Sequence, residues 1–115
     1  MDQQTILVVE DDYDISILLQ HIFHDNKIAS FYANSLQEAE EALTWLRPTH
    51  IFLDVFLPDG NGLDWIKCKN INCEITIMTG NIEEVGSEAE GFCIIKKPFL
   101  AKSILNSLHH TKEIL

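Results

Sequence analysis

Four groups of polar side chains end or directly follow apolar runs of this sequence, and their types suit the binding of a metal ion and a phosphoryl group. These groups are Glu10–Asp12, Asp54, Thr79 and Lys96–Lys97. Carboxylates held close together repel one another, so that one of them takes up a proton or a cation binds between them. Mg²⁺ is typically bound by one or two carboxylates together with phosphate oxygens and water. A lysine ammonium and a threonine hydroxyl can hold phosphoryl oxygens, and the combination favours phosphoryl transfer with a carboxylate as the nucleophile.

Asp54 is the strongest single signal among these residues, because it interrupts the apolar stretch "IFLDVFL" at residues 51–57. An isolated buried carboxylate costs free energy unless something pairs with it. The residues that follow, from Pro58 to Gly62, are typical of a loop. We therefore expect Asp54 to lie at the end of a buried strand, facing acidic residues from another part of the chain.

Five short apolar runs predict the strands that position these side chains. They span residues 5–9, 27–33, 50–55, 74–78 and 91–95. Helical patterns separate the runs, and this alternation predicts right-handed crossovers and a parallel sheet covered by helices on both faces. Ligands bind at the carboxyl ends of the strands in such sheets. Four of the five predicted strand ends therefore bring the polar groups to one edge of the sheet.

The helices between the strands are predicted from apolar spacing and from capping residues. They are expected at residues 15–25, 36–46, 62–69 and 81–90, with a closing helix from about residue 100. Ser35 and Glu38 have the spacing of a capping box at the start of the second helix. The fourth helix is expected to be poor, because Gly86 lies in its middle.

Each polar group also has an ordinary structural explanation. Taken alone, an acidic turn such as Glu10–Asp12 is more often a helix cap than a metal site. A threonine after a strand and a Lys-Pro pair in a loop are usually structural as well. The joint occurrence of all four groups at predicted strand ends is what favours a common site.

The composition limits the classes of function. With 115 residues and an apolar fraction of 46%, we expect a single domain over residues 1–115. The net charge of −10 argues against direct binding to nucleic acid, but it allows a cation or a partner with a basic face. Three cysteines without a CxxC pair do not describe a disulfide framework or a zinc site. No membrane span or signal peptide is evident, so we expect a cytoplasmic protein with reduced thiols.

Four stretches together resemble the receiver domain of two-component response regulators, and the resemblance covers the whole chain. They are "ILVVEDD" (6–12), "IFLDVFLPDGNG" (51–62), "TIMTG" (76–80) and "IKKPF" (95–99). The resemblance implies an α/β fold: a doubly wound, flavodoxin-like sheet of five parallel strands in the order 2-1-3-4-5. It also implies a phosphoacceptor signalling domain rather than an enzyme, one that assists its own phosphorylation and dephosphorylation.

The resemblance further implies a role for each site residue. Asp54 is the expected phosphoacceptor, and it takes a phosphoryl group from a histidine kinase or a histidine phosphotransfer protein in an Mg²⁺-dependent reaction. Thr79 and Lys97, rather than Lys96, are expected to bind the phosphoryl oxygens. The expected metal ligands are Asp11, Asp54, the backbone carbonyl of Phe56 and, largely through water, Glu10. The phosphorylated domain is expected to signal by altered binding to a downstream protein, without contacting nucleic acid or a membrane.

Two features depart from the family pattern. Ile94 stands where an aromatic residue usually switches position, and the segments 54–79 and 79–97 are each about one helical turn shorter than the pattern. A pseudo-receiver, which binds partners without being phosphorylated, is therefore one alternative. A phosphatase of the haloacid dehalogenase type is another, but its mechanism needs a second aspartate two residues after the first, where this chain has Phe56.

Overall fold

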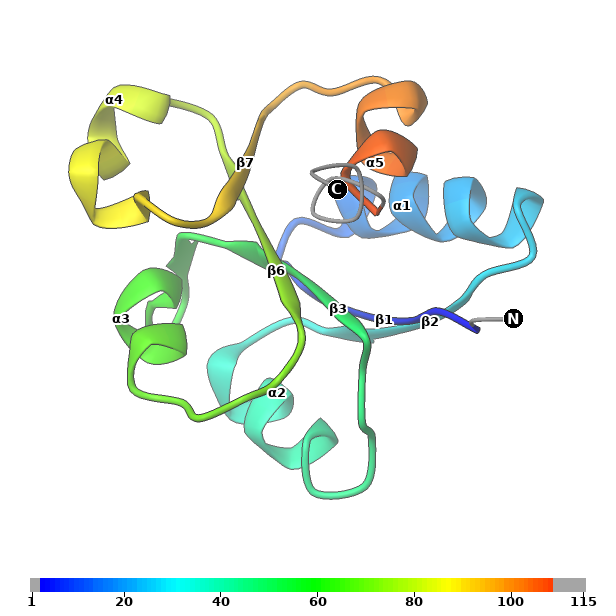
Figure 1. The fold of residues 1–115 in the computed structure, drawn as a ribbon, viewed down its shortest axis with the longest axis horizontal. Helices are drawn as coiled ribbons and strands as arrows, with labels where there is room; N and C mark the ends of the chain where they lie inside the picture. Colours follow the sequence, from blue (N-terminus) through cyan, green and yellow to red (C-terminus); the bar gives the residue numbers. More distant parts are fainter. Residues whose placement is uncertain (1–2, 109–115) are drawn as a thin grey trace.

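The centre of the molecule is a parallel sheet that places one end of every strand at a common edge. The computed structural model describes residues 3–108. Its five-stranded sheet has the order β2-β1-β3-β6-β7 (Figure 1). The strands are β1 (Thr5–Val9), β2 (Ala29–Ala33), β3 (His50–Asp54), β6 (Glu74–Thr79) and β7 (Cys93–Lys96). Counted among themselves, these strands have the order 2-1-3-4-5, which confirms the doubly wound fold that the family resemblance implied.

Helices cover both faces of the sheet and create two apolar cores. The helices are α1 (Tyr13–Asp25), α2 (Leu36–Ala42), α3 (Gly62–Lys67), α4 (Ile82–Val85) and α5 (Ala101–Ser107). One core joins the sheet to α1 and α5, and the other joins it to α2, α3 and α4 (Figure 1). Alternate residues of β1 serve the two cores, so that Ile6 and Val8 face α1 while Leu7 and Val9 face α2. The central strands therefore consist almost entirely of buried apolar residues, as their sequences predict.

The capping box predicted at the start of α2 is present with a small shift. The Ser35 hydroxyl accepts a hydrogen bond from the Glu38 backbone N–H at 3.1 Å. The Glu38 carboxylate reaches back to the Asn34 N–H at 2.9 Å, one residue before the N-cap. Two of the N–H groups around this helix end are therefore satisfied locally.

Two predicted strands begin later than expected, because each is preceded by a residue with a positive φ angle. β2 begins at Ala29 rather than at residue 27, and Lys27 has a φ of 60°. β7 begins at Cys93 rather than at residue 91, and Gly91 has a φ of 94°. Backbone in this region cannot continue a strand.

The fourth helix and the loop after β3 also differ from the prediction. The segment predicted as one poor helix is a single turn, α4, followed by a short 3₁₀ helix at Gly86–Ala89, and Gly86 interrupts it with a φ of 50°. The loop after β3 contains a small antiparallel hairpin of β4 (Phe56–Leu57) and β5 (Gly60–Asn61), which the sequence analysis did not predict. Within residues 3–108, no helix is long and apolar enough to cross a membrane.

Candidate functional site

Asp54 is the last residue of the central strand β3, between β1 and β6. Only 8% of its surface is exposed. Glu10 and Asp11 directly follow the neighbouring strand β1, and Glu10 is buried while Asp11 is exposed. One carboxylate oxygen from each of the three residues lies within 4.8 Å of the other two. The structure thus brings together three of the acidic residues that the sequence placed at strand ends.

Lys97 supplies the positive charge of this acidic cluster (Glu10, Asp11 and Asp54). Its Nζ lies 2.7 Å from Glu10 Oε1 and 3.3 Å from Asp54 Oδ1. The loop that carries Lys97 is held by a hydrogen bond of 2.7 Å from its backbone N–H to the Thr79 carbonyl. Lys96, by contrast, is an exposed residue at the end of β7. The structure therefore brings Lys97 to the cluster and leaves Lys96 on the surface.

Burial controls the protonation of the cluster. Desolvation raises the pKa of Glu10 to about 7, against the effect of its hydrogen bond to Lys97 and of the Asp12 N–H, and the charge of Asp54 adds to the increase. Burial alone lowers the pKa of Lys97, but the hydrogen bond to Glu10 and the charge of Asp54 outweigh it and leave that pKa raised. The lysine is therefore held in its charged form, while burial resists the ionisation of Glu10. One ammonium does not balance the cluster, and a further cation would favour the ionised carboxylates.

The donor set of the cluster fits a hard divalent cation. Three carboxylates offer oxygen ligands within a small space, which suits Mg²⁺ better than a softer metal. Asp11 is exposed, so water or phosphate oxygens would have access to an ion held by these carboxylates. The backbone carbonyl of Phe56, the other expected ligand, belongs to β4, two residues after Asp54.

Asp12 has the structural role that acidic turns usually have. Its Oδ1 accepts hydrogen bonds from the backbone N–H groups of Asp14 at 2.9 Å and Ile15 at 3.2 Å, so it is the N-cap of α1. Its own N–H donates to Glu10 Oε2 at 3.0 Å. The residues of the acidic turn therefore have different roles: Asp12 caps the helix, while Glu10 and Asp11 belong to the cluster.

Thr79 ends β6 at the same edge of the sheet and is 2% exposed. Its hydroxyl accepts a hydrogen bond from the Asn81 N–H and donates to the Asn81 carbonyl, both at 3.1 Å. Asn81 is in turn the N-cap of α4, since its Oδ1 accepts from the Glu83 N–H at 3.0 Å. A hydroxyl that turned towards a phosphoryl oxygen would release this contact, which links occupancy of the site to the conformation of the segment that begins at Asn81.

The loop after Asp54 is anchored on three sides. The Gly62 N–H donates to the Val55 carbonyl at 2.6 Å, and Asn61 Oδ1 caps α3 through the Asp64 N–H at 3.0 Å. The third anchor is Asp59, whose carboxylate accepts hydrogen bonds from the first residues of α2. These hydrogen bonds lower the pKa of the Asp59 carboxyl. Sequence analysis missed this contact, because an aspartate between proline and glycine is typical of a turn and does not indicate a distant helix.

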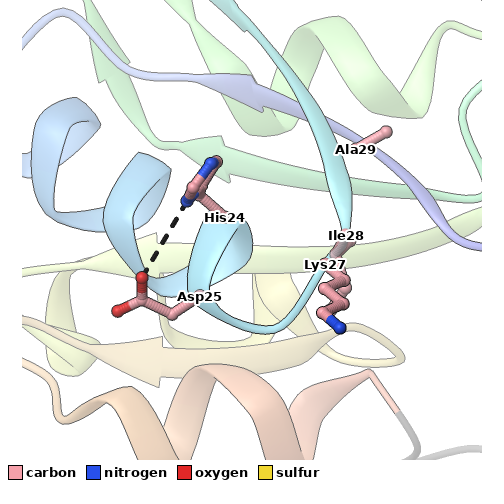
Figure 2. Close-up of a pocket in the computed structure, with 5 residues that line it drawn as sticks. All are labelled: His24, Asp25, Lys27, Ile28 and Ala29. Carbon is pink, nitrogen blue, oxygen red and sulfur yellow. Dashed lines mark ion pairs between the residues drawn. The ribbon is translucent and has the colours of Figure 1, made fainter.

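Two hollows in the surface differ in their relation to the cluster. One of about 260 Å³ lies between α1, the end of β2 and α2, and Glu10 and Asp11 contribute to its wall. The other, of about 620 Å³, lies between the end of α1 and the start of β2 (Figure 2). His24 and Asp25 are part of its lining, and His24 Nδ1 lies 3.9 Å from Asp25 Oδ1. Since β2 runs parallel to β1, its only partner in the described sheet, this second hollow lies at the edge of the sheet opposite the cluster.

Known proteins share both the sequence pattern and the fold. The profile of a family described as "Response regulator receiver domain" matches residues 6–109. Sporulation initiation phosphotransferase F of Bacillus subtilis (strain 168) is 32% identical over 82 residues, which is 69% of this chain and 66%, just under two thirds, of that protein.

Two solved structures superpose closely on this chain. A two-component response regulator from Clostridium difficile has a TM-score of 0.87 at 24% identity, and the matched region is 96% of this chain and 97% of that one. Chemotaxis response regulator CheY4 of Vibrio cholerae has a TM-score of 0.85 at 22% identity, with coverage of 95% and 98%. At these identities the likeness shows a shared fold.

Proposed function

This chain belongs to the family of response regulator receiver domains, and on that premise we propose that Asp54 accepts a phosphoryl group and that the phosphorylated domain changes its binding to a downstream protein. The observation that carries the proposal is the position of Asp54, buried at the end of the central strand with two acidic neighbours and one ammonium. A carboxylate in this position has both a nucleophilic oxygen and groups that can balance an incoming phosphoryl charge.

In the proposed reaction, an Asp54 oxygen attacks the phosphorus of a phosphohistidine on a histidine kinase or a phosphotransfer protein. The new P–O bond forms as the P–N bond breaks, and the imidazole leaves and takes up a proton. Lys97, 3.3 Å from Asp54, is placed to bind a phosphoryl oxygen. Mg²⁺ held by Glu10, Asp11 and Asp54 would offset the repulsion between these carboxylates and the phosphoryl group. Thr79 and the Phe56 carbonyl complete the proposed site.

The remaining proposals concern the context of the domain. The relative from Bacillus subtilis, sporulation initiation phosphotransferase F, supports phosphotransfer as the activity of this chain. The net charge of −10 favours a partner with a basic face. Cys68, Cys73 and Cys93 are not paired with one another in the structure, and we propose that the protein works in the reducing cytoplasm, where thiols stay reduced. We propose that residues 1–115 form a single receiver domain in that compartment.

The proposed function is tested by intact-mass measurement after incubation with acetyl phosphate or phosphoramidate. With Mg²⁺ present, we expect the mass to increase by one phosphoryl group, and with the metal chelated we expect no increase. A chain that stays unmodified with both donors in the presence of Mg²⁺ would instead support a pseudo-receiver. The features that favour a pseudo-receiver are Ile94, which replaces an aromatic residue, and the short helix α4, which has four residues.

The side chain at position 56 is expected to control the lifetime of the aspartyl phosphate. Phe56 lies two residues after Asp54, is 57% exposed and has no group that can orient a water molecule for in-line attack. Phe56→Asn should accelerate hydrolysis about tenfold, which corresponds to about 1.4 kcal/mol of activation free energy. Decay of the phosphoprotein is followed by intact mass. Phe56→Leu is the matched control, since it removes the ring without adding a hydrogen-bonding group, and equal rates for the two variants would contradict the role of the amide.

Residues 80–90 are expected to become more ordered when the site is occupied. The Thr79 hydroxyl is bonded to Asn81 at the start of α4, and Val85 and Ala89 anchor the segment to the core. A ligand shifts a conformational equilibrium only through its differential affinity for the states. Mg²⁺ with beryllofluoride should therefore slow amide exchange in 80–90 about tenfold.

Ile94→Ala provides the control for the slower amide exchange in residues 80–90. Ile94 is partly buried against the core and has no ring with which to fill or vacate a pocket. The slowing in 80–90 should therefore survive in this variant. Unchanged exchange in 80–90 together with large changes around Ile94 would show that position 94 carries the switch after all.

A further inference from the structure

We propose that Asp59 is a positioning residue that couples the acidic cluster to helix α2, an inference that rests on the proposed function. Asp59 lies at the tip of the β4–β5 hairpin, in the loop that follows the phosphoacceptor. Its Oδ1 accepts a hydrogen bond from the Leu36 N–H at 2.9 Å, and its Oδ2 accepts one from the Gln37 N–H at 3.0 Å. Each oxygen thus binds one of the first two N–H groups of α2, more than 20 residues earlier in the chain.

The start of α2 depends on this loop, because the N–H groups of its first turn donate hydrogen bonds to two acceptor residues, Ser35 and Asp59. Ser35 takes the Glu38 N–H through its hydroxyl and the Ala39 N–H through its carbonyl. The N–H groups of Leu36 and Gln37 have no partner within the helix, as is general for the first turn, and Asp59 supplies both. A movement of the hairpin tip therefore breaks two charge-assisted hydrogen bonds unless α2 moves with it.

Apolar contact reinforces the connection between the hairpin tip and α2. A Cβ atom at Gly60 would lie 3.0 Å from Leu36 Cδ1, so the backbone next to Asp59 lies directly against the first residue of the helix. Leu57, on the other strand of the hairpin, belongs to the same core as Leu36. The loop and the helix start thus pack as one unit.

At its other end, the loop begins at Asp54 itself. The Gly62 N–H bonds to the Val55 carbonyl, which closes the hairpin directly beside the phosphoacceptor. The Phe56 carbonyl, a proposed ligand of the metal, lies on the same hairpin, three residues before Asp59. Metal or phosphoryl binding that fixes the Phe56 carbonyl therefore also fixes the hairpin tip, and through Asp59 it fixes the start of α2.

The direct test measures Mg²⁺ affinity in the whole chain by isothermal titration calorimetry. Asp59→Ala should raise the dissociation constant about three- to tenfold, less than the roughly 10–100-fold typical of groups that hydrogen-bond a ligand directly. Asp59→Asn keeps one acceptor oxygen and should fall between the wild type and Asp59→Ala. Ser35→Ala is the matched control, because it removes a cap from the same helix end without touching the loop, and it should leave the dissociation constant unchanged.

Linkage requires the reverse effect as well. In the wild type, Mg²⁺ with beryllofluoride should slow amide exchange at Leu36 and Gln37. The slowing should persist in Ser35→Ala and be lost in Asp59→Ala.

The outcomes separate the inference from the proposed function. If the wild type binds Mg²⁺ and is phosphorylated, but Asp59→Ala binds Mg²⁺ with wild-type affinity, the inference is wrong and the function stands. Equal losses of affinity in Asp59→Ala and Ser35→Ala would show that Asp59 is only a helix cap, which also overturns it. A wild type that binds no Mg²⁺ would overturn both.

Discussion

Asp54→Asn is expected to abolish phosphorylation while the domain stays folded. An amide oxygen is not a nucleophile towards phosphorus, so the variant loses the bond-forming atom of the proposed reaction. The fold should tolerate the change, because asparagine has nearly the same shape and Lys97 keeps Glu10 as a partner at 2.7 Å. The free energy of unfolding should therefore change by less than about 1 kcal/mol. Intact-mass measurement with acetyl phosphate and Mg²⁺ reads the first effect, and urea denaturation reads the second.

Asp64→Asn is the matched control for this loss of phosphorylation. It makes the same change in charge and shape at an exposed acidic residue in the first turn of α3, outside the cluster. It should be phosphorylated to the same extent as the wild type. Stoichiometric phosphorylation of Asp54→Asn at another residue would show that the phosphoacceptor has been assigned wrongly.

The alternation of apolar runs and helices predicted that the polar strand ends lie at one edge of the sheet, and the family resemblance implied the strand order that makes β1 and β3 neighbours. Parallel strands place their carboxyl ends at one edge, so Glu10, Asp11 and Asp54 had to lie close together once the sheet order was known. The choice of Lys97 over Lys96 came from the family resemblance. The structure supplies its geometric reason, since the Lys97 ammonium is the one that reaches Glu10 and Asp54.

The sequence did not predict the contacts made by loops. Asp59 lies in a Pro-Asp-Gly turn, and its bonds to Leu36 and Gln37 depend on how α2 is positioned by the core rather than on any local pattern. The late start of β7 has a local cause that apolar periodicity does not reveal, because Gly91 lies in a turn with a positive φ. Backbone conformation and long-range capping thus account for most of what the sequence analysis missed.

For the same reason, the sequence did not decide which residues of the acidic turn Glu10–Asp12 cap the helix and which join the cluster. The sequence allowed either a helix cap or a metal site at Glu10–Asp12, and the structure shows a helix cap at Asp12 and places Glu10 and Asp11 in the acidic cluster. Asp12 accepts hydrogen bonds from the N–H groups of Asp14 and Ile15 in the first turn of α1, while Glu10 turns towards Lys97 and is buried. Only the direction of each side chain decides between these roles, and that direction follows from the packing of α1 on the sheet.

Gly62→Ala is expected to cause a large loss of stability, because the glycine lies against the backbone of the central strand. A Cβ atom at this position would lie 2.2 Å from the Asp54 carbonyl oxygen and 3.1 Å from Leu53 Cγ. The first contact is with backbone in the central strand, so neither side can yield without moving β3 or the start of α3. Overpacking of this kind should lower the free energy of unfolding by about 3 kcal/mol, which outweighs the roughly 1 kcal/mol that alanine gains over glycine in helix propensity.

Gly80→Ala is the control that isolates this steric effect. No atom lies within 4 Å of the Cβ that it would add, and Gly80 is not among the glycines with a positive φ. Its free energy of unfolding should therefore stay within about 0.5 kcal/mol of the wild type. Urea denaturation of both variants provides the comparison, and equal midpoints would contradict the close approach of Gly62 to Asp54. Because that approach fixes the backbone directly beside Asp54, the proposed phosphoacceptor, any Gly62→Ala protein that folds should also bind Mg²⁺ more weakly than Gly80→Ala.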